Sequence, residues 1–346
     1  MMRYGLPPKQ GLYDPELEHD ACGIGFVADL KKAASHTIIE QATEILCRLT
    51  HRGAAGSDEA TGDGAGMLIQ TPDKFLRKVA DAEGFGLPAL GSYASAIVFL
   101  AVDGDERAKQ VATVEQAVAA EGQSFLGWRE VPTDPSKIGQ IARSGMPAIK
   151  QLFIGAAEGL DQPAFERKLY VIRRLIESAI EKQGTAFHIA SLSSKTFLFK
   201  GMFLAHQTPE FFPDMQDPDL ESRLALVHQR YSTNTFPTWD LAQPFRYLAH
   251  NGEINTIRGN QNWMNAREGT LKSSLFGEDL NKLFPVMRTG MSDSARFDNA
   301  LEFLHLAGRD LPQSMLMMIP EAWENDPTMT EERRAFYEYY SCMMEP

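Results

Sequence analysis

The sequence predicts an α+β fold in which antiparallel sheets are covered by helices. Apolar runs of strand length recur along the chain, and several of them follow one another directly. Amphipathic stretches of helix length alternate with these runs, which is the pattern of helices packed on sheets. With 346 residues, of which 43% are hydrophobic, the chain can bury the core of one large domain or of two smaller ones.

The first half of the chain contains four predicted strands and three predicted helices. The strands are expected at 23–30, 93–102, 124–131 and 148–154, and the helices at 35–49, 106–120 and 162–182. Ser35 is a suitable N-cap for the first helix, whose apolar residues recur on one face. Cys47 lies beside that apolar stripe, so we expect it to be a buried structural cysteine.

The second half continues the same alternation. We expect a hairpin from 187–192 and 196–199, a surface loop at 207–219, strands at 224–229 and 245–250, and helices at 256–268, 295–307 and 331–343. The chain ends directly after the last of these helices, without a capping signal. We therefore expect the domain to be incomplete at its C-terminus.

Composition excludes several classes of protein. The formal net charge of −12 argues against a broad nucleic-acid or anionic-membrane surface. No stretch approaches the roughly 20 apolar residues that span a bilayer, and the first 21 residues lack the apolar run of a secretory signal. Three cysteines are too few for a disulfide framework or a tetrahedral zinc site. Reduced thiols and a cytoplasmic location fit best.

The segment 51–66 is unusually rich in glycine. This density indicates backbone with positive φ or backbone packed closely against a neighbour. A phosphate-binding loop is disfavoured because no Gly-Lys-Ser/Thr follows, and because Asp58, Glu59 and Asp63 would repel phosphate. The same three acids make a poor metal site, since no histidine or further acid lies at ligand spacing nearby.

Cys22 is the candidate nucleophile. Amide hydrolysis needs a nucleophile, a proton carrier and donors for the tetrahedral oxyanion. The residues 1–21 look like a leader ending at the small Ala21, whose removal would make Cys22 the N-terminus. Its own α-amine, with a pKa of roughly 7.7–8, could then act as the base for the thiol. The alternative is a buried strand cysteine.

Three further positions could complete such a site. Arg230 follows a predicted strand and could pair with a carboxylate, although an arginine there could equally be a surface ion-pair member. Asn251-Gly252 could be a plain turn, or could direct a side-chain amide and a backbone N–H at an oxyanion. Asp293 could be a helix N-cap, or the counter-ion of a ligand ammonium group.

At this combination the sequence resembles the class II glutamine amidotransferase domain of the glutamate synthase large subunit. The resemblance runs from Cys22 to the C-terminus, and its last three motifs point to glutamate synthase rather than to other amidotransferases. The motifs are Cys22-Gly-Ile-Gly-Phe, Leu49-Thr-His-Arg-Gly-Ala, Gly62-Asp-Gly-Ala-Gly, His228-Gln-Arg-Tyr-Ser-Thr-Asn-Thr-Phe-Pro-Thr-Trp239, His250-Asn-Gly-Glu-Ile-Asn255, Arg258-Gly-Asn-Gln-Asn-Trp263 and Ile319-Pro-Glu-Ala-Trp323.

The resemblance implies an N-terminal-nucleophile hydrolase fold, a four-layer αββα sandwich of two antiparallel sheets between helices. It divides the chain into a propeptide leader at 1–21 and an amidotransferase domain at 22–346. It also implies roles for individual residues. Cys22 attacks L-glutamine, Asn251 and Gly252 form the oxyanion hole, Arg230 binds the α-carboxylate, Asp293 binds the α-ammonium, Thr233 lines the pocket, and Arg52 supports the site.

The same resemblance implies a longer parent enzyme. We expect no cofactor in this chain, and FMN and an iron–sulfur cluster in the synthase part that transfers ammonia to 2-oxoglutarate. Expected partners are those synthase domains and a reductase subunit or ferredoxin, and the sequence does not decide between NADPH and ferredoxin as electron donor. Two alternatives remain: a related cysteine amidase of the same fold, and a non-catalytic glutamine-binding module.

Overall fold

A computed structural model describes residues 9, 11, 23–30, 34–230, 236–252, 254 and 256–342. Ala21, Cys22 and Thr233, and nearly all of the predicted leader, lie outside these residues. The strands are β1 Ile24–Ala28, β2 Ala65–Gln70, β3 Tyr93–Leu100, β4 Ser124–Glu130, β5 Ala148–Gly155, β6 His188–Ile189, β7 Thr196–Gly201 and β8 Leu224–Gln229.

Helices connect and cover these strands. The α-helices are α1 His36–Arg48, α2 Asp73–Ala82, α3 Gly104–Ala120, α4 Gln140–Ser144, α5 Gln162–Glu181, α6 Gln207–Phe211, α7 Ile257–Glu268, α8 Asp293–Leu306, α9 Leu311–Met318 and α10 Glu331–Ser341. Short 3₁₀ turns are η1 Thr50–Arg52, η2 Pro135–Lys137, η3 Pro213–Gln216 and η4 Gly277–Leu283. Within the part of the chain that is described, no helix has the length and apolar character needed to cross a bilayer.

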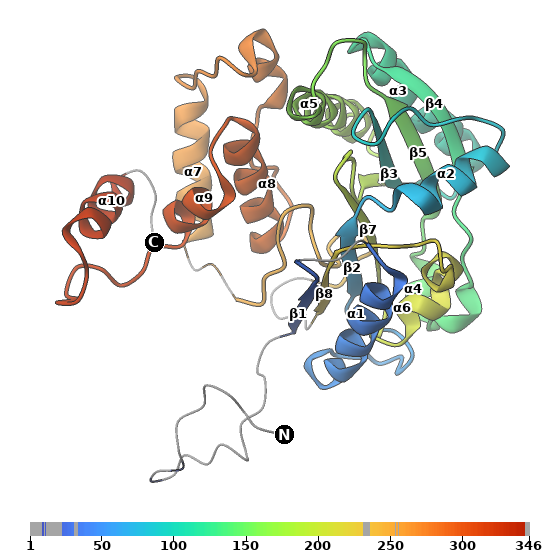
Figure 1. Ribbon diagram of the computed structural model, residues 1–346, viewed down its shortest axis with the longest axis horizontal. Helices are drawn as coiled ribbons and strands as arrows, with labels where there is room; N and C mark the ends of the chain where they lie inside the picture. Colours follow the sequence, from blue (N-terminus) through green and yellow to red (C-terminus); the bar gives the residue numbers. More distant parts are fainter. Residues whose placement is uncertain are drawn as a thin grey trace.

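The strands form two antiparallel sheets, so the predicted fold class is confirmed. The strand order is β1-β8-β2-β7 in the first sheet and β4-β5-β3-β6 in the second. Helices α3 and α5 lie on one side of the strands, and α1 and α6 on the other (Figure 1). The predicted layering of sheets between helices is therefore present.

A shared core joins the two sheets. Its members include Met67, Ile69, Phe197, Phe199, Ala225 and Val227 from the first sheet, and Tyr93, Ile97, Phe99, Ile149 and Phe153 from the second. The alternate residues of β3 and β5 face the other way and pack on α3 and α5 in a second cluster. Strand β3 is buried on both faces, which explains why its sequence reads as one continuous apolar run.

Most elements predicted from periodicity are confirmed to within a few residues. Helix α1 begins after Ser35 as predicted, although the Ser35 side chain makes no capping hydrogen bond. Five residues of its predicted stripe are buried in the core, and Cys47 beside them is only half-buried. Helices α2, α4 and α9 and strand β2 were not predicted. The signal for α2 is the spacing of its buried residues, Phe75, Leu76, Val79 and Ala80.

The predicted hairpin of 187–192 with 196–199 is wrong. Strand β6 pairs with β3 in the second sheet, whereas β7 pairs with β2 in the first. The intervening serines are bound by the Glu166 carboxylate, which accepts hydrogen bonds from Ser193 Oγ and from Ser194 N and Oγ. A polar anchor on α5 therefore lets the chain cross between sheets at a place where the sequence suggests a tight turn.

The predicted surface loop at 207–219 is also wrong. This segment forms α6 and η3, and the side chains of Phe211 and Phe212 are fully buried. Their rings pack on Phe203 and Trp239 at centroid distances of 4.8–5.7 Å. The three prolines of the segment suggested a loop, but one of them begins η3, where a missing N–H costs no hydrogen bond.

The predicted strand at 245–250 is replaced by a compact turn. Phe245 N donates to Leu248 O at 2.8 Å. Tyr247 N donates to the Asp298 carboxylate on α8, also at 2.8 Å. Because a buried aspartate takes over hydrogen bonds that a sheet partner would supply, the apolar residues of this segment are buried without strand pairing.

A buried ionic cluster connects α5, α8 and this turn. We define the ionic cluster as Arg173, Arg174, Glu177, Arg246, Arg288, Asp298 and Glu302. Glu177 is central, accepting from Arg173 at 2.8 Å and from Arg174 at 2.9 Å. Burial alone would raise the pKa of Glu177, but the surrounding guanidinium groups prevail and hold that pKa well below its usual range.

We expect Glu177→Ala to lower the free energy of unfolding by about 3–5 kcal/mol, because it leaves buried guanidinium groups uncompensated. Since the folded-state pKa of Glu177 is depressed, this contribution is present above its unfolded pKa of about 4.3 and is lost as the pH falls through the folded value. Urea titration followed by circular dichroism at neutral pH and at stepwise lower pH measures both effects.

The matched control is Glu44→Ala. Glu44 also accepts from an arginine on its own helix, but both side chains of that pair are exposed, so stability should change little. A Glu177→Ala protein as stable as the control would contradict the structural role of the ionic cluster.

Candidate active site

The end of β8 meets the start of β1 at Gly23, the residue that follows the predicted nucleophile in the sequence. The two strands pair antiparallel, with Ile24 opposite His228. Beyond this pair, Gln229 N donates to Gly23 O at 2.8 Å. Cys22 lies outside the described residues, and Gly23 is the residue bonded to it. The first sheet therefore holds the neighbour of the predicted nucleophile by a ladder hydrogen bond.

The Asn251 side chain lies directly against Gly23. A Cβ atom placed on Gly23 would be 2.8 Å from Asn251 Nδ2 and 2.4 Å from Gln229 O. Asn251 and Gly252 are both exposed, and neither has the positive φ of a tight Asn-Gly hairpin turn. Asn251-Gly252 is therefore not a type I′ hairpin turn, and its side-chain amide lies beside the residue that follows Cys22 in the sequence.

The segment leading to Asn251 is held by its own side chains. Gln243 Nε2 donates to His250 O at 3.0 Å, and His250 N donates to Gln243 Oε1 at 2.8 Å. These two bonds close the turn between them in the manner of a paired strand. The His250 ring lies within hydrogen-bonding distance of Ser294 Oγ, at 2.9 Å. The position of Asn251 is thereby tied to both the turn and α8.

Arg230 follows β8 immediately and is buried, so it is not a surface ion-pair residue. Its backbone N donates to Gly64 O at 2.8 Å. Burial lowers the pKa of its guanidinium, and the carboxylates of Asp63, Asp240 and Asp293 oppose this shift. Arg230 and Asp293, more than 60 positions apart in the chain, therefore share one electrostatic environment.

Asp293 is the first residue of α8, and the N-cap is Ser292, whose Oγ accepts from Ala295 N at 3.3 Å. The alternative that Asp293 is the N-cap is therefore wrong. Asp293 Oδ2 accepts from Ile254 N at 3.0 Å, which ties α8 to the segment after Gly252. Burial lowers the pKa of His250, and Asp293 opposes that shift, so the aspartate lies near both His250 and Arg230.

Comparison with known proteins agrees with this geometry. Residues 22–346 match the family described as glutamine amidotransferases class-II. The chain belongs to this family.

Proteins that are similar to this chain agree with the family assignment, and the three that follow are named glutamate synthases. The glutamate synthase [NADPH] large chain of Bacillus subtilis is 50% identical over 100% of this chain and 23% of its own length. The glutamate synthase [NADH] of Schizosaccharomyces pombe is 44% identical, over 99% of this chain and 16% of its own length. The ferredoxin-dependent glutamate synthase 2, chloroplastic, of Arabidopsis thaliana is 38% identical, over 95% and 20%. The chain spans less than a quarter of each relative.

Arg52 lies near the end of β8, where its neighbour Gly53 packs against Gln229. It ends the turn η1 and is half-buried. A Cβ atom on the following residue, Gly53, would lie 2.2 Å from Gln229 Nε2, so the Gly53 backbone packs closely against the Gln229 side chain. Within the described part of the chain, Arg52 Nε has no hydrogen-bond partner. The structure thus places the Arg52 turn against the end of β8.

The glycine-rich segment also packs closely against the backbone after β7. A Cβ atom on Gly62 would lie 2.1 Å from Phe203 O, and Gly64 adopts φ of 137°, as the glycine density predicts. Asp58, considered above for a phosphate or metal site, instead accepts from Ala60 N, Thr61 Oγ1 and Ile141 N. Within the described ranges, no three His, Cys, Asp or Glu residues are grouped to hold a metal ion.

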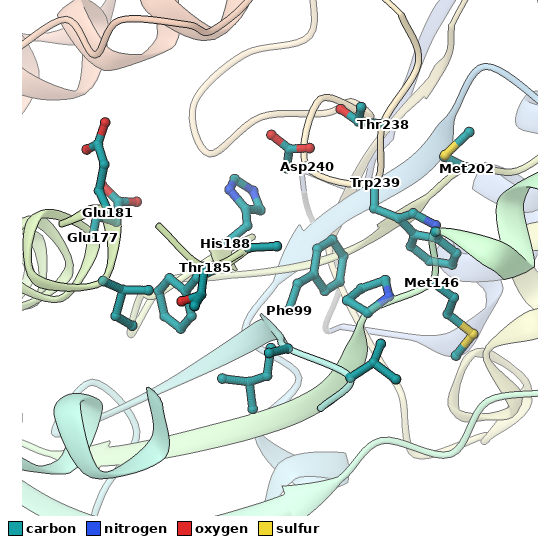
Figure 2. Close-up of a pocket in the computed structure, with 18 of the residues that line it drawn as sticks. Phe99, Met146, Glu177, Glu181, Thr185, His188, Met202, Thr238, Trp239 and Asp240 are labelled. Atoms are coloured by element: carbon teal, nitrogen blue, oxygen red, sulfur yellow. The ribbon is translucent and has the colours of Figure 1, made fainter. Parts of the chain in front are cut away.

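A cavity of about 780 Å³ lies next to the site, between β3, α5 and the segment 237–240 (Figure 2). Asp240, one of the carboxylates near Arg230, belongs to the wall of this cavity. The labelled His188 side chain points towards Asp240 (Figure 2). Arg230, Asn251 and Asp293 do not line this cavity. Its wall includes Phe99, Met146, Glu177, Glu181, Thr185, Met202, Trp239 and Arg288.

Sequence reasoning missed several residues of this neighbourhood. Asp63 and Asp240 act on Arg230, and no pattern in the sequence brings them to it. Lys200 on β7 is buried, and burial lowers its pKa to about 7. Its Nζ donates to Asp240 O at 2.6 Å. His228 contacts Asn251, and its only signal is a polar side chain within an otherwise apolar strand.

We expect Gly23→Ala to disturb the site, because the added methyl group would lie 2.4 Å from the Gln229 carbonyl oxygen and 2.8 Å from the Asn251 amide. Overpacking of this kind costs about 1–3 kcal/mol, so the melting temperature should fall together with ammonia release from glutamine. Gly86→Ala is the matched control, since a Cβ atom there meets open space. Equal behaviour of the two variants would contradict the close contact.

Proposed function

We propose that this chain is the glutaminase part of a glutamate synthase, hydrolysing L-glutamine to glutamate and ammonia. The observation that carries the proposal is the contact of the Asn251 amide with Gly23, next to Cys22. Membership of the class-II glutamine amidotransferases, and likeness to glutamate synthases over almost the whole chain, support the same reaction. No observation favours another amide substrate or a non-catalytic module.

In the proposed reaction, the Cys22 thiol passes its proton to the α-amine of the same residue. The sulfur attacks the side-chain carbonyl carbon of glutamine, and the oxyanion accepts hydrogen bonds from Asn251 Nδ2 and Gly252 N. The ammonium returns the proton to the departing nitrogen, and ammonia leaves. Water then attacks the thioester, which releases glutamate and the free thiol. This use of the α-amine requires removal of residues 1–21.

The head group of glutamine selects the substrate. We propose that Arg230 binds the α-carboxylate and that Asp293 binds the α-ammonium. The guanidinium forks onto a carboxylate with two parallel hydrogen bonds, which a point charge cannot do. The shared electrostatic environment of the two residues supports this pairing, since a zwitterion needs one charge of each sign. Thr233 would line the pocket, and Arg52 would support the nucleophile from the neighbouring turn.

The remaining steps belong to the longer enzyme. We propose that ammonia passes to synthase domains that carry FMN and an iron–sulfur cluster and use 2-oxoglutarate. The described residues of this chain do not fit such a cluster, because Cys47 on α1 and Cys342 at the end of α10 belong to separate helices and no three His, Cys, Asp or Glu residues are grouped there. The names of the relatives include NADPH, NADH and ferredoxin, so the electron donor stays open. A cytoplasm-like, reducing location suits the free thiols.

Cys22→Ala should abolish release of ammonia from glutamine, because it removes the proposed nucleophile. Cys47 is on α1, and burial, reinforced by Glu210, raises the pKa of its thiol. Cys342→Ala is the control and should leave turnover unchanged, since Cys342 is exposed at the end of α10. An enzyme-coupled ammonia assay measures both.

Intact mass of the same preparations tests the leader. The active protein should begin at Cys22. A fully active protein that retains residues 1–21 would contradict the α-amine as base, and undiminished turnover in Cys22→Ala would refute the glutaminase itself.

Arg230→Lys should raise KM for glutamine about tenfold or more, because lysine loses the bidentate carboxylate contact. Wild-type protein should turn over glutamine but not α-N-acetylglutamine, which lacks the α-ammonium. Arg48→Lys, a change at an exposed ion pair, is the control. Equal use of both substrates would favour a general cysteine amidase, so initial rates with each substrate decide between the two functions.

A further inference from the structure

His228 is a buried histidine that the reaction above does not use. It lies in the central part of the first sheet, opposite Ile24 of β1 on one side and Gly66 of β2 on the other. Its side chain is 1% exposed. A buried polar side chain in an apolar strand is costly unless it makes hydrogen bonds, so its partner indicates its role.

That partner is the proposed oxyanion donor. His228 Nε2 lies 2.5 Å from Asn251 Oδ1. An amide oxygen only accepts hydrogen bonds, so the imidazole must carry its proton on Nε2 and donate it. With Oδ1 held in this way, Nδ2 lies on the other branch of the same planar amide. That branch is the closer of the two to Gly23, where a Cβ atom would lie 2.8 Å from Nδ2 and 3.4 Å from Oδ1.

The surroundings keep the imidazole neutral. Burial lowers the pKa of His228 to about 4, and the Arg230 guanidinium reinforces this shift. The contacts with the Asn251 side chain and with the His250 backbone oppose it. A neutral ring has one proton, and Nδ1 is buried with no hydrogen-bond partner among the described residues. A proton on Nε2 leaves Nδ1 as an unused acceptor rather than an unused donor.

We propose that His228 is a positioning residue that holds the Asn251 amide with its N–H groups towards the oxyanion. This inference rests on the proposed glutaminase function. An asparagine amide has two orientations related by a half-turn, and only one places Nδ2 at the substrate. The other orientation presents Oδ1, which repels a developing negative charge. Donation from His228 to Oδ1 selects the productive orientation before glutamine binds.

Three substitutions test the proposal in the intact protein. His228→Gln places an amide nitrogen close to the position of Nε2, whereas His228→Asn has too short a side chain to reach Asn251. His228→Ala removes the ring altogether. Melting temperature and circular dichroism establish that each variant folds, and the two amide variants remain informative if His228→Ala does not fold.

We expect kcat to fall about 10–100-fold in His228→Asn and His228→Ala. Deleting an oxyanion donor itself typically lowers kcat by about 10²–10³-fold, so the loss of its orientation should cost no more than the lower end of that range. KM for glutamine should change little, because the hydrogen bond from Asn251 to the oxyanion is made only in the transition state. His228→Gln should retain most of kcat. In an Asn251→Ala background, the same changes at His228 should cost nothing further, since the group they orient is gone.

Two results would overturn the inference alone: equal losses in folded His228→Gln and His228→Asn, or losses that persist in full in the Asn251→Ala background. Either would mean that His228 acts on the structure and not through Asn251. A wild-type protein that releases no ammonia from glutamine would instead refute the proposed function itself, and with it this role. The two failures are therefore distinguished by the wild-type assay.

Discussion

The pairing of β1 with β8 is the constraint on which the rest of the site depends. The ladder continues to the bond from Gln229 N to Gly23 O, at the residue bonded to Cys22. Strand β8 also pairs with β2, and Arg230 N donates to Gly64 O. One short central strand therefore joins the neighbour of the proposed nucleophile to the arginine proposed to bind the carboxylate. A shift by one residue would turn every side chain of β8 to the opposite face.

Helix α8 links this strand end to the interior of the protein. Asp293 at its start binds the segment after Gly252, Asp298 holds the turn before His250, and Glu302 lies in the ionic cluster with α5. Three acids spaced along one helix thus attach the Asn251 segment to the scaffold. The described residues of this segment, 243–252 and 254, form no helix or strand, so these side-chain contacts replace the hydrogen bonds that a strand would provide.

Periodicity in the local sequence predicted the helices that bury one apolar face and the strand that is buried on both faces. The stripe of α1, the apolar run of β3 and the amphipathic α5 all appear within a few residues of their predicted bounds. The errors share a cause. At 187–199 and 245–250, a carboxylate far away in the sequence accepts backbone hydrogen bonds, and at 207–219 distant aromatic rings bury the phenylalanines. No pattern within these segments predicts such partners.

The sequence by itself determined the fold class, the family resemblance and the chemical types of the site residues, because periodicity, composition and motif spacing are local properties. Only the tertiary structure decided which strands pair, that Arg230 is buried among three carboxylates, and that His228 faces Asn251. These depend on contacts between residues far apart in the chain. Desolvation and hydrogen-bond geometry exist only once those contacts have formed.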